Sequence, residues 1–530
     1  MWRIHILMNT QKNDAVTIED LQVKCAELEQ EKAELKAKLN WFEEQFRLNR
    51  HRQFGTSSEK TDYDQPQLFN EIESEAKPAK IEPTLEEITY TRRKQAGHRE
   101  EQLKDLPVET IEYRLPPEEQ VCSCCGNALH EMSTEVRQEL KFTPAQMTRV
   151  CHVRYVYGCR SCEQQETTTP IVTAPMPAPV LPGSLVSPSL MASVMTQKYL
   201  DGMPLYRQEQ AWSRLGVELS RQTMANWMIQ GSSRYLEDLY NRMHEHLLKL
   251  DIAHADETTV QVLKEDGREA EAKSYMWLYR SGRDGPPIVL FDYQTTRANK
   301  HPSRFLKGFK GYLHVDGYPG YHGLEGVILV GCLAHARRRF TDALKAMPKT
   351  AQGTVLSTAQ EGLDFCNQLY AIESALKELS PDKRYEERQK RSVPVLEAFS
   401  AWLKMQTPRV LPKSALGEAI RYCRNQWDKL IAYLKDGRLE IDNNRAERSI
   451  KPFVMGRKAW LFSQTPRGAK ASAVIYSIIE TAKENGLNPF QYLTYLFEKL
   501  PNVYITDSSV LDNYLPWSSG LPDHCRMPRN

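Results

Sequence analysis

The sequence predicts a multidomain α/β protein whose largest domain is a mixed β-sheet with helices on its faces. The chain has 530 residues, which is enough for roughly three to five domains. Between residues 250 and 340 the pattern reads as three strands, a helix, a fourth strand, and a fifth strand that runs into a helix. This order favours a mixed sheet. Residues 341–435 then read as helices, so we expect a core at 250–490 with a helical insertion at about 341–435.

The composition is that of an ordinary soluble globular protein, with 41% hydrophobic and 26% charged residues. The net charge is only +2, so binding to a polyanion must rest on local clusters of charge. No apolar run approaches the roughly 18 residues of a membrane span, and the opening "MWRIHILMNT" is too short for a secretory signal. We therefore expect a cytoplasmic protein, in which paired cysteines indicate metal binding more often than disulfides.

The N-terminal residues 14–52 are predicted to form a leucine-zipper coiled coil. Eight of nine seam positions are apolar over four heptads, and most flanking positions are charged or amide, which is typical of helices that pair with a partner. The alternative is a single amphipathic helix packed on its own protein. The seam positions are Ile18, Leu21, Cys25, Leu28, Lys32, Leu35, Leu39, Phe42 and Phe46.

Two cysteine pairs predict a zinc-binding domain at 116–168. "CSCCG" contains Cys122 and Cys125, and "CRSC" contains Cys159 and Cys162. Four thiolates in tetrahedral geometry form a closed, structural zinc site, and the alternating pattern between the pairs predicts a hairpin that brings them together. Cys124, Cys151 and His152 are spare candidates. Polar residues 53–115 and Pro-rich residues 169–190 read as linkers on either side.

Residues 191–246 contain a candidate helix-turn-helix. In "MPLYRQEQAWSRLGVELSRQTMANWMIQ", Gly216 is expected to end a first amphipathic helix and Ser220 to cap a second. Such a pair can place a recognition helix in the major groove of DNA. Arg221, Gln222 and Asn226 would then point toward bases or phosphates. The pattern alone is only moderately specific, because similar helix pairs are common in proteins that do not bind DNA.

Three carboxylates are candidates for a divalent-metal site. Asp256 lies in a predicted strand, Asp316 ends another, and Glu447 is the one carboxylate among seven Lys or Arg side chains between Arg445 and Lys470. Carboxylates at sheet ends bind Mg²⁺, and paired ions about 4 Å apart support phosphoryl transfer. The alternative for Glu447 is a helix-capping box with Asn444. The carboxylates of Asp251, Glu257 and Asp442 compete for the same role.

Several sequence motifs, taken together, resemble those of the transposases of the bacterial IS66 insertion-sequence family (TnpC type). They are "CSCCG", "LYRQEQAWSRLGVELSRQTMANW", "ADETTVQVL", "VDGYPGY", "GCLAHARRRF", "IDNNRAERSIKP", "GRKAWLF" and "YSIIETAKENGLNPFQYL". The likeness covers nearly the whole chain. Within the C-terminal tail, expected at 491–530, the proline-bearing stretch "NYLPWSSGLPDHC" departs somewhat from the tail that is usual in the family. Cys332 and His335 in "CLAHARRRF" also resemble a Cys-x-x-His signature of other transposase cores, where a structural role and a functional role are both open.

The resemblance implies a ribonuclease-H-like core with an Asp-Asp-Glu triad, here Asp256, Asp316 and Glu447, that holds two Mg²⁺ or Mn²⁺ ions beside one structural Zn²⁺ elsewhere. The implied activity is cleavage and strand transfer at terminal inverted repeats, by a nucleoid-associated homodimer or higher oligomer with possible small accessory proteins. Rival interpretations are a nuclease that cuts without joining and an inactive DNA-binding regulator. The candidate DNA-binding residues are Arg207, Arg221, Gln222, Asn226, Asn443, Asn444, Arg445, Arg448, Lys451, Arg457 and Lys458.

Overall fold

The structure is a computed structural model that describes residues 147–157, 172–346, 357–505 and 507–528, with seven isolated helical positions between Lys24 and Glu43. The chain divides into two compact units, one of residues 1–57 with 154–527 and one of residues 58–153 with 528–530. The architecture below is that of the first unit. The four predicted zinc ligands and the predicted linker at 53–115 lie outside the described residues, as does most of the predicted coiled coil.

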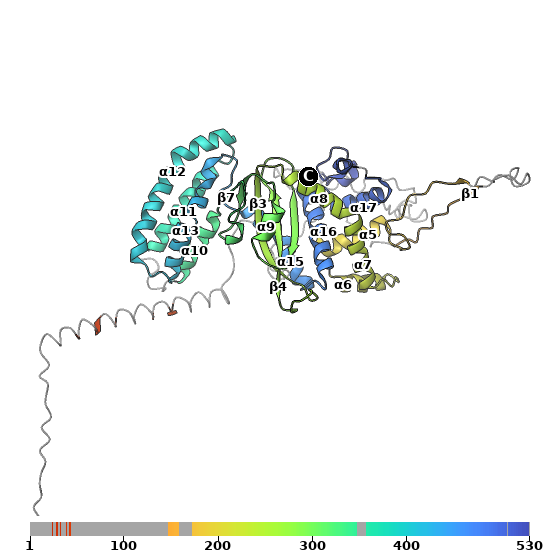
Figure 1. The fold of residues 1–530 in the computed structure, drawn as a ribbon, viewed down its shortest axis with the longest axis horizontal. Helices are drawn as coiled ribbons and strands as arrows, with labels where there is room; N and C mark the ends of the chain where they lie inside the picture. The colour runs from red at the N-terminus through yellow and green to blue at the C-terminus, as the bar shows by residue number, and fades with distance from the viewer. Residues whose placement is uncertain are drawn as a thin grey trace, which may run out of the picture. The chain divides into compact units, whose positions relative to one another are not determined.

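A five-stranded mixed sheet forms the middle of this unit (Figure 1). Its spatial order is β5-β4-β3-β6-β7. The first three strands along the chain pair antiparallel, whereas β6 runs parallel to β3 and β7 runs parallel to β6. The mixed sheet and its strand order along the chain are therefore as predicted. The strands are β3 Ile252–Gln261, β4 Lys273–Ser281, β5 Val289–Gln294, β6 Gly311–His314 and β7 Val327–Val330.

The edge of the sheet at β5 is covered by helix α16 (Pro466–Glu484). Two backbone N–H groups of β5 donate to hydroxyls of that helix: Val289 to Thr481 Oγ1 at 3.0 Å and Phe291 to Ser477 Oγ at 2.8 Å. An uncovered edge strand would offer these groups to another chain. The helix therefore both buries the sheet and closes one of its edges.

Helices that precede the sheet pack into the same hydrophobic core as the sheet itself. The predicted helix-turn-helix is present as α6 (Leu205–Arg214) and α7 (Arg221–Gly231). Gly216 in the turn has φ +77°, and the Ser220 side chain accepts the Thr223 N–H at 3.1 Å, as the sequence predicted. The second helix does not end there. It continues through a π-helical turn, Ser232–Leu236, into α8 (Glu237–Leu247).

Two predicted boundaries are corrected by burial. Residues 169–190 were expected to be a spacer, but Val180, Leu181 and Val186 are buried in the core, and helix α5 (Pro188–Tyr199) starts inside that range. The tail at 491–530 likewise contributes to the core, because α17 (Pro489–Lys499) packs on α5 and Leu511, Leu515 and Leu521 are buried. Short 3-10 turns follow at Leu500–Asn502, Ser508–Tyr514 and Asp523–Cys525. Apolar side chains in both segments supply the burial.

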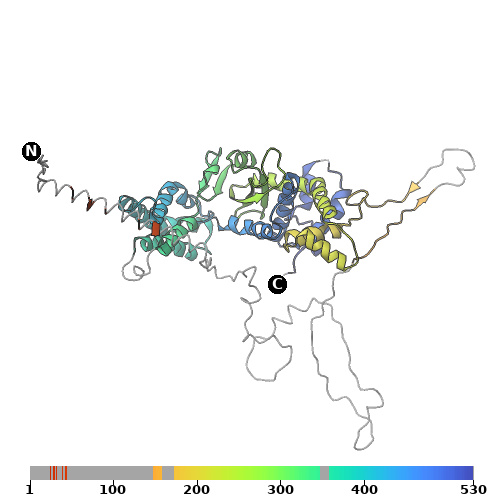
Figure 2. The ribbon, with the colours of Figure 1, turned by 90° about the horizontal axis from the view of Figure 1, so that it is seen from below.

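The helical insertion lies on the β7 side of the sheet, whereas α16 and α5 to α8 lie on the β5 side (Figures 1 and 2). It has its own hydrophobic cluster, in which aromatic rings from three helices meet. Its helices are α10 Leu333–Ala346, α11 Thr358–Ala375, α12 Pro381–Gln406, α13 Ala415–Asn425 and α14 Trp427–Leu430, with 3-10 turns at Thr407–Arg409 and Ala432–Lys435.

A buried arginine fixes the segment that leads from the insertion back to the sheet. The side chain of Arg388 is 1% exposed and pairs with Glu373, with an Nη2–Oε2 distance of 2.6 Å. It also donates to the backbone carbonyls of Tyr433, Asp436 and Leu439. These bonds hold residues 433–439 directly before the helix that carries Glu447, α15 (Asn444–Trp460).

The other described elements are small. The helix α9 spans Lys300–Phe305, a 3-10 turn spans Pro319–Tyr321, and β1 (Val156–Tyr157) pairs antiparallel with β2 (Val172–Thr173). The last pairing joins segments on either side of the second predicted cysteine pair. Over the described ranges, no helix is both long and apolar enough to cross a membrane.

Candidate active site

Strand register brings Asp256 and Asp316 to the same place in the sheet. His254 of β3 is the pairing partner of His314 of β6, and the two strands are parallel. Each aspartate follows its histidine by two residues. Because side chains two residues apart on a strand share a face, the register directs Asp256, in the middle of β3, and Asp316, two residues beyond the end of β6, toward the same place. One backbone N–H fixes each carboxylate: Glu257 donates to Asp256 at 2.8 Å and Tyr318 to Asp316 at 2.8 Å.

The third carboxylate, Glu447, comes from the first turn of α15. Asn443, directly before that helix, ties it to β3. Its Nδ2 donates to the carbonyl of Ala255 at 2.8 Å, and its Oδ1 lies 2.9 Å from His254 Nδ1. The backbone N–H of Asn443 also donates to Cys332 Sγ at 3.2 Å. The start of α15 is therefore fixed against the strand that carries Asp256.

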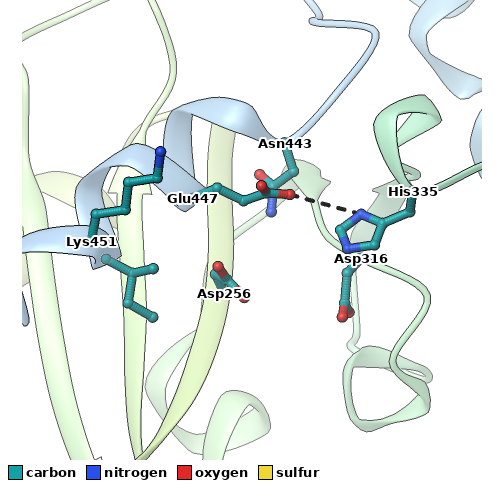
Figure 3. A pocket seen from close by; sticks show the side chains of 7 residues that line it. Asp256, Asp316, His335, Asn443, Glu447 and Lys451 are labelled. Atoms are coloured by element: carbon teal, nitrogen blue, oxygen red, sulfur yellow. Dashed lines mark ion pairs between the residues drawn. The ribbon is translucent and has the colours of Figure 1, made fainter. Parts of the chain in front are cut away.

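The three carboxylates line one pocket (Figure 3). Its volume is about 230 Å³, far above the roughly 10–15 Å³ that one water molecule requires, so it has room for cations together with phosphate oxygens. Figure 3 shows Asp256 below Glu447, with His335 to the right of Glu447 and facing it. The lining residues are Asp256, Asp316, His335, Asn443, Glu447, Ile450 and Lys451.

Electrostatics in the pocket favour a bound cation. Burial raises the pKa of Asp256 well above its usual range, and the charges of Glu257, Asp316 and Glu447 raise it further. Carboxylates that share a site cannot all ionise cheaply unless a positive charge is near. Oxygen ligands of this kind suit Mg²⁺ and Mn²⁺. The donor set therefore fits divalent cations of the hard type.

Glu447 does not act as a helix cap. The residue at the N-cap position is Asn443, its side chain makes no capping bond, and the amide of Asn444 instead donates to Asp442 at 2.8 Å. Glu447 Oε1 is buried without a hydrogen-bond partner among the described residues. It lies 3.8 Å from His335 Nδ1, while Glu447 Oε2 lies 3.9 Å from a guanidinium nitrogen of Arg338. Burial lowers the pKa of His335, which favours the neutral imidazole.

The three competing carboxylates all have partners elsewhere, and none of them lines the pocket. Asp251 is exposed and accepts a bond from Arg438 at 2.8 Å. Glu257 has a buried side chain that pairs with Arg297 and Tyr321. Asp442 accepts bonds from Asn444 and, at 3.0 Å, from the hydroxyl of Tyr370. These contacts are structural.

The basic run around Glu447 divides into exposed and internal side chains. Arg448, Lys451 and Lys458 are exposed, as a phosphate-binding role requires. Asn443 differs from them: it is 2% exposed, and its amide contacts His254 and the Ala255 carbonyl inside the protein, which favours a role in positioning the helix over a phosphate contact. Three others of the predicted set also bond within the protein: Asn444 to Asp442, Arg445 to Glu440, and Arg457 to Thr258 and Thr259.

In the helix-turn-helix, Arg207, Arg221, Gln222 and Asn226 are all exposed. Arg207 lies on α6 and the other three on α7. Met224, Trp227 and Met228 face inward and are buried. The polar face of α7 is therefore open to a ligand, whereas its apolar face packs on the core.

A pair of buried histidines beside the aspartates was not foreseen. The rings of His254 and His314 stack with centroids 4.2 Å apart, and both are fully buried. Burial lowers the pKa of His254 to about 4. The sequence could have indicated this pair, because the motif His-x-Asp occurs twice, as "HAD" at 254–256 and "HVD" at 314–316. The repetition marks the two positions where adjacent strands meet in register.

Comparisons with known proteins agree on one family. A model described as "Transposase IS66 family" matches residues 183–471, and one described as "zinc-finger binding domain of transposase IS66" matches residues 119–163. A model described as "IS66 C-terminal element" matches residues 477–517. A fourth, described as "Transposase C of IS166 homeodomain", matches residues 41–111, which include most of the stretch expected to be a linker.

Similar whole proteins occur in Sinorhizobium fredii (strain NBRC 101917 / NGR234). The uncharacterized protein y4jD is 31% identical over 418 residues, which cover 76% of this chain and 79% of y4jD. The uncharacterized protein y4hP is 27% identical over 414 residues, which cover 75% of this chain and 73% of y4hP. Both alignments extend well beyond any single motif.

Proposed function

The chain belongs to the IS66 transposase family, and from that premise we propose that it is an Asp-Asp-Glu DNA transposase that cuts the ends of its element and joins them to target DNA. One observation carries the proposal. Asp256, Asp316 and Glu447 line a single pocket, although 60 residues (316 − 256) and 131 residues (447 − 316) separate them along the chain.

The sheet supports a ribonuclease-H-like assignment for the core. Three antiparallel strands, β5, β4 and β3, are followed in the sheet by the parallel strands β6 and β7. Asp256 lies within β3, and Asp316 lies just beyond the end of the adjacent parallel strand β6. The helical insertion between β7 and α15 accounts for the long separation between Asp316 and Glu447. It leaves the glutamate in place because Arg388 and Asn443 fix the returning chain.

Asp256, Asp316 and Glu447 would hold two divalent ions, Mg²⁺ or Mn²⁺, as the crowded, buried carboxylates and the unpaired Glu447 Oε1 support. Ions at this position would activate the attacking oxygen and stabilise the leaving oxygen of a phosphodiester. The first attack, by water, frees a 3′ hydroxyl at the element's end. The second, by that hydroxyl, joins the end to target DNA.

Residues of this chain around the pocket would position the DNA. Lys451 lines the pocket one helical turn beyond Glu447, and Arg448 and Lys458 are exposed on the same helix. Their charges suit phosphate contacts, which fix register without reading sequence. The exposed face of the helix-turn-helix, with Arg207, Arg221, Gln222 and Asn226, would contact the terminal inverted repeats.

The N-terminal segments would assemble and orient the complex. We propose that Cys122, Cys125, Cys159 and Cys162 hold one structural Zn²⁺, which the match of the zinc-finger model to residues 119–163 supports. The zipper would pair protomers so that two element ends meet. Leu28 and Leu39, two of its predicted seam residues, are helical and more than half exposed, at 57% and 58%. The substrate places the protein on bacterial DNA, with small accessory proteins of the same element as possible partners.

A strand-transfer assay tests the joining step directly. Purified protein is mixed with precut element ends that already carry a 3′ hydroxyl, with target plasmid and with Mg²⁺ or Mn²⁺. We expect joined products whose formation depends on the 3′ hydroxyl, and a 3′ dideoxy end is the matched control. Cleavage of uncut ends without any joining of precut ends would instead identify a nuclease. Binding to the ends with neither reaction would identify a regulator.

A further inference from the structure

Two buried polar atoms face each other across the pocket without a partner. His335 Nδ1 and Glu447 Oε1 are both buried, and neither has a hydrogen-bond partner within the described ranges. They lie 3.8 Å apart, and both residues line the pocket (Figure 3). Among the described residues, His335 and Glu447 also form, with Cys332, a group of possible metal ligands whose donor atoms all lie within 4.8 Å of one another.

The separation of the two atoms fits a shared metal ion better than a direct hydrogen bond. At 3.8 Å they are too far apart for a direct hydrogen bond, which ends near about 3.2 Å. A buried polar group without a partner is unfavourable, so two such atoms that face each other favour the binding of a third group between them. Two ligands at about 2.1 Å from one ion can be at most about 4.2 Å apart. The observed separation is within that limit.

The backbone holds His335 in this position. It lies in the first turn of α10, and the start of that helix is tied to the segment before α15 by two bonds. Leu333 N–H donates to the carbonyl of Ile441 at 3.1 Å, and Asn443 N–H donates to Cys332 Sγ at 3.2 Å. The helices that carry His335 and Glu447 are thus joined at their N-terminal ends, so the two side chains are preorganised to face each other. Cys332 already uses its sulfur as an acceptor in this joint.

We propose that His335 is a nitrogen ligand of the divalent ion that Glu447 holds, and that it biases this position toward Mn²⁺ over Mg²⁺. The inference rests on the proposed function, because it takes Glu447 as a metal ligand. Mg²⁺ prefers oxygen ligands and retained waters, whereas an imidazole ligand favours transition-metal ions. Bound to the ion, His335 Nδ1 and Glu447 Oε1 would both gain the partner that they lack.

The experiment measures directly coordinated nitrogen around Mn²⁺ in the full-length, zinc-loaded protein. Mn²⁺ is titrated and counted by electron paramagnetic resonance, and electron spin-echo modulation then detects ¹⁴N bonded to the ion. We expect nitrogen coupling in the wild type. His335→Gln keeps size and polarity but removes the imidazole, so it should lose the coupling and bind Mn²⁺ about ten-fold more weakly, with little change for Mg²⁺. The exposed His322 gives the matched control, His322→Gln, which should retain the coupling.

The outcomes separate this inference from the proposed function. Mn²⁺ that binds the wild type without nitrogen coupling, or coupling that persists in His335→Gln, overturns the role of His335 and leaves the carboxylate site standing. A wild type that binds no Mn²⁺ overturns both. A wild-type spectrum without nitrogen coupling overturns the role of His335 whatever the variant does, and circular dichroism checks that His335→Gln is folded before its spectrum is compared.

Discussion

Asn443 Oδ1 lies 2.9 Å from Nδ1 of His254, and this contact fixes the protonation of the ring. Asn443 Nδ2 donates to the carbonyl of Ala255, so the amide oxygen is the acceptor left for His254, and Nδ1 must carry the proton. A neutral, oriented imidazole therefore supports the strand that holds Asp256, and one asparagine ties that strand to the helix that holds Glu447.

The first prediction is that Asn443→Ala lowers strand-transfer activity much more than it lowers the stability of the fold. It leaves His254 Nδ1 and the Ala255 carbonyl unpaired in the core, which should lower the free energy of unfolding by about 1–3 kcal/mol. Because α15 loses its tie to β3, strand transfer should fall far more than stability does. Thermal unfolding and the strand-transfer assay measure the two effects.

The neighbouring Asn444→Ala is the control for that comparison. The Asn444 amide bonds only to Asp442 among the contacts described above and is partly exposed, so its loss should cost under about 1 kcal/mol. Equal activity in Asn443→Ala and wild type would show that the tie does not position Glu447.

A second prediction concerns Glu440, which anchors the first turn of α15. Its Oε1 accepts bonds from Arg283 and Arg445, each at 2.7 Å. Burial works to raise the pKa of Glu440, but His254 and the two arginines outweigh it and lower the pKa to about 2. A carboxyl whose pKa is depressed on folding stabilises the protein above its unfolded pKa of about 4.5, and this is lost as pH falls toward 2.

Glu440→Gln should therefore destabilise the protein at pH 7 by about 1–3 kcal/mol, with the difference from wild type shrinking between pH 4.5 and pH 2. Chemical denaturation across that range measures it. Glu418→Gln is the matched control, because its pairing with Arg421 at 3.8 Å is exposed and should contribute almost nothing. A difference that stays constant with pH would rule out the ion pairs as the cause.

The third prediction concerns zinc, in the part of the chain outside the described residues. Purified protein should contain about one Zn²⁺ per chain, and Cys122→Ser combined with Cys159→Ser should lose it. Binding to terminal-repeat DNA should weaken while the catalytic unit keeps its unfolding transition. Elemental analysis and gel-shift assays check this. Cys151→Ser, at an exposed free cysteine, should keep the metal; full zinc content in the double variant would refute the ligand assignment.

Features that depend on a few neighbouring residues were predictable from the sequence. The strands followed from alternating patterns, and the turn between α6 and α7 followed from Gly216 and Ser220, whose φ of +77° and capping bond are local properties. The meeting of Asp256 and Asp316 in one pocket agrees with the ligand set that was drawn from the family resemblance. That ligand set stays a prediction for the Glu447 experiment below.

Long-range pairing is what the sequence could not show. Asn443 and Arg445 stand in a basic run that looks uniformly suited to phosphate. In the structure, however, Asn443 contacts His254 and Arg445 pairs with Glu440, so both side chains make contacts within the protein. The same holds for the C-terminal segment. Its prolines suggested a tail, but Leu511 and Leu515 are buried in the core. In the same segment α17 packs on α5, a helix that starts 301 residues earlier in the chain (489 − 188).

The last prediction is Glu447→Gln, which tests the role that the pocket gives to this residue. A glutamine also serves in a capping box, so a purely structural role would leave activity nearly unchanged. The variant keeps size and shape but removes the negative charge that a divalent ion needs. Cleavage and strand transfer should then fall by orders of magnitude, whereas folding, zinc content and binding to terminal-repeat DNA stay close to wild type. Asp256→Asn and Asp316→Asn should behave alike and combine non-additively, because the three residues would act as one unit.

Asp442→Asn is the control for that series, because Asp442 is the nearest competing carboxylate in the chain. Its Oδ2 accepts bonds from the Asn444 side chain and the Tyr370 hydroxyl, and an amide oxygen at that position can still accept them. This variant should therefore retain substantial activity, with at most a modest loss of stability. Normal Mg²⁺-dependent strand transfer by Glu447→Gln, or its abolition by Asp442→Asn alone, would mean that the metal site is not the one proposed.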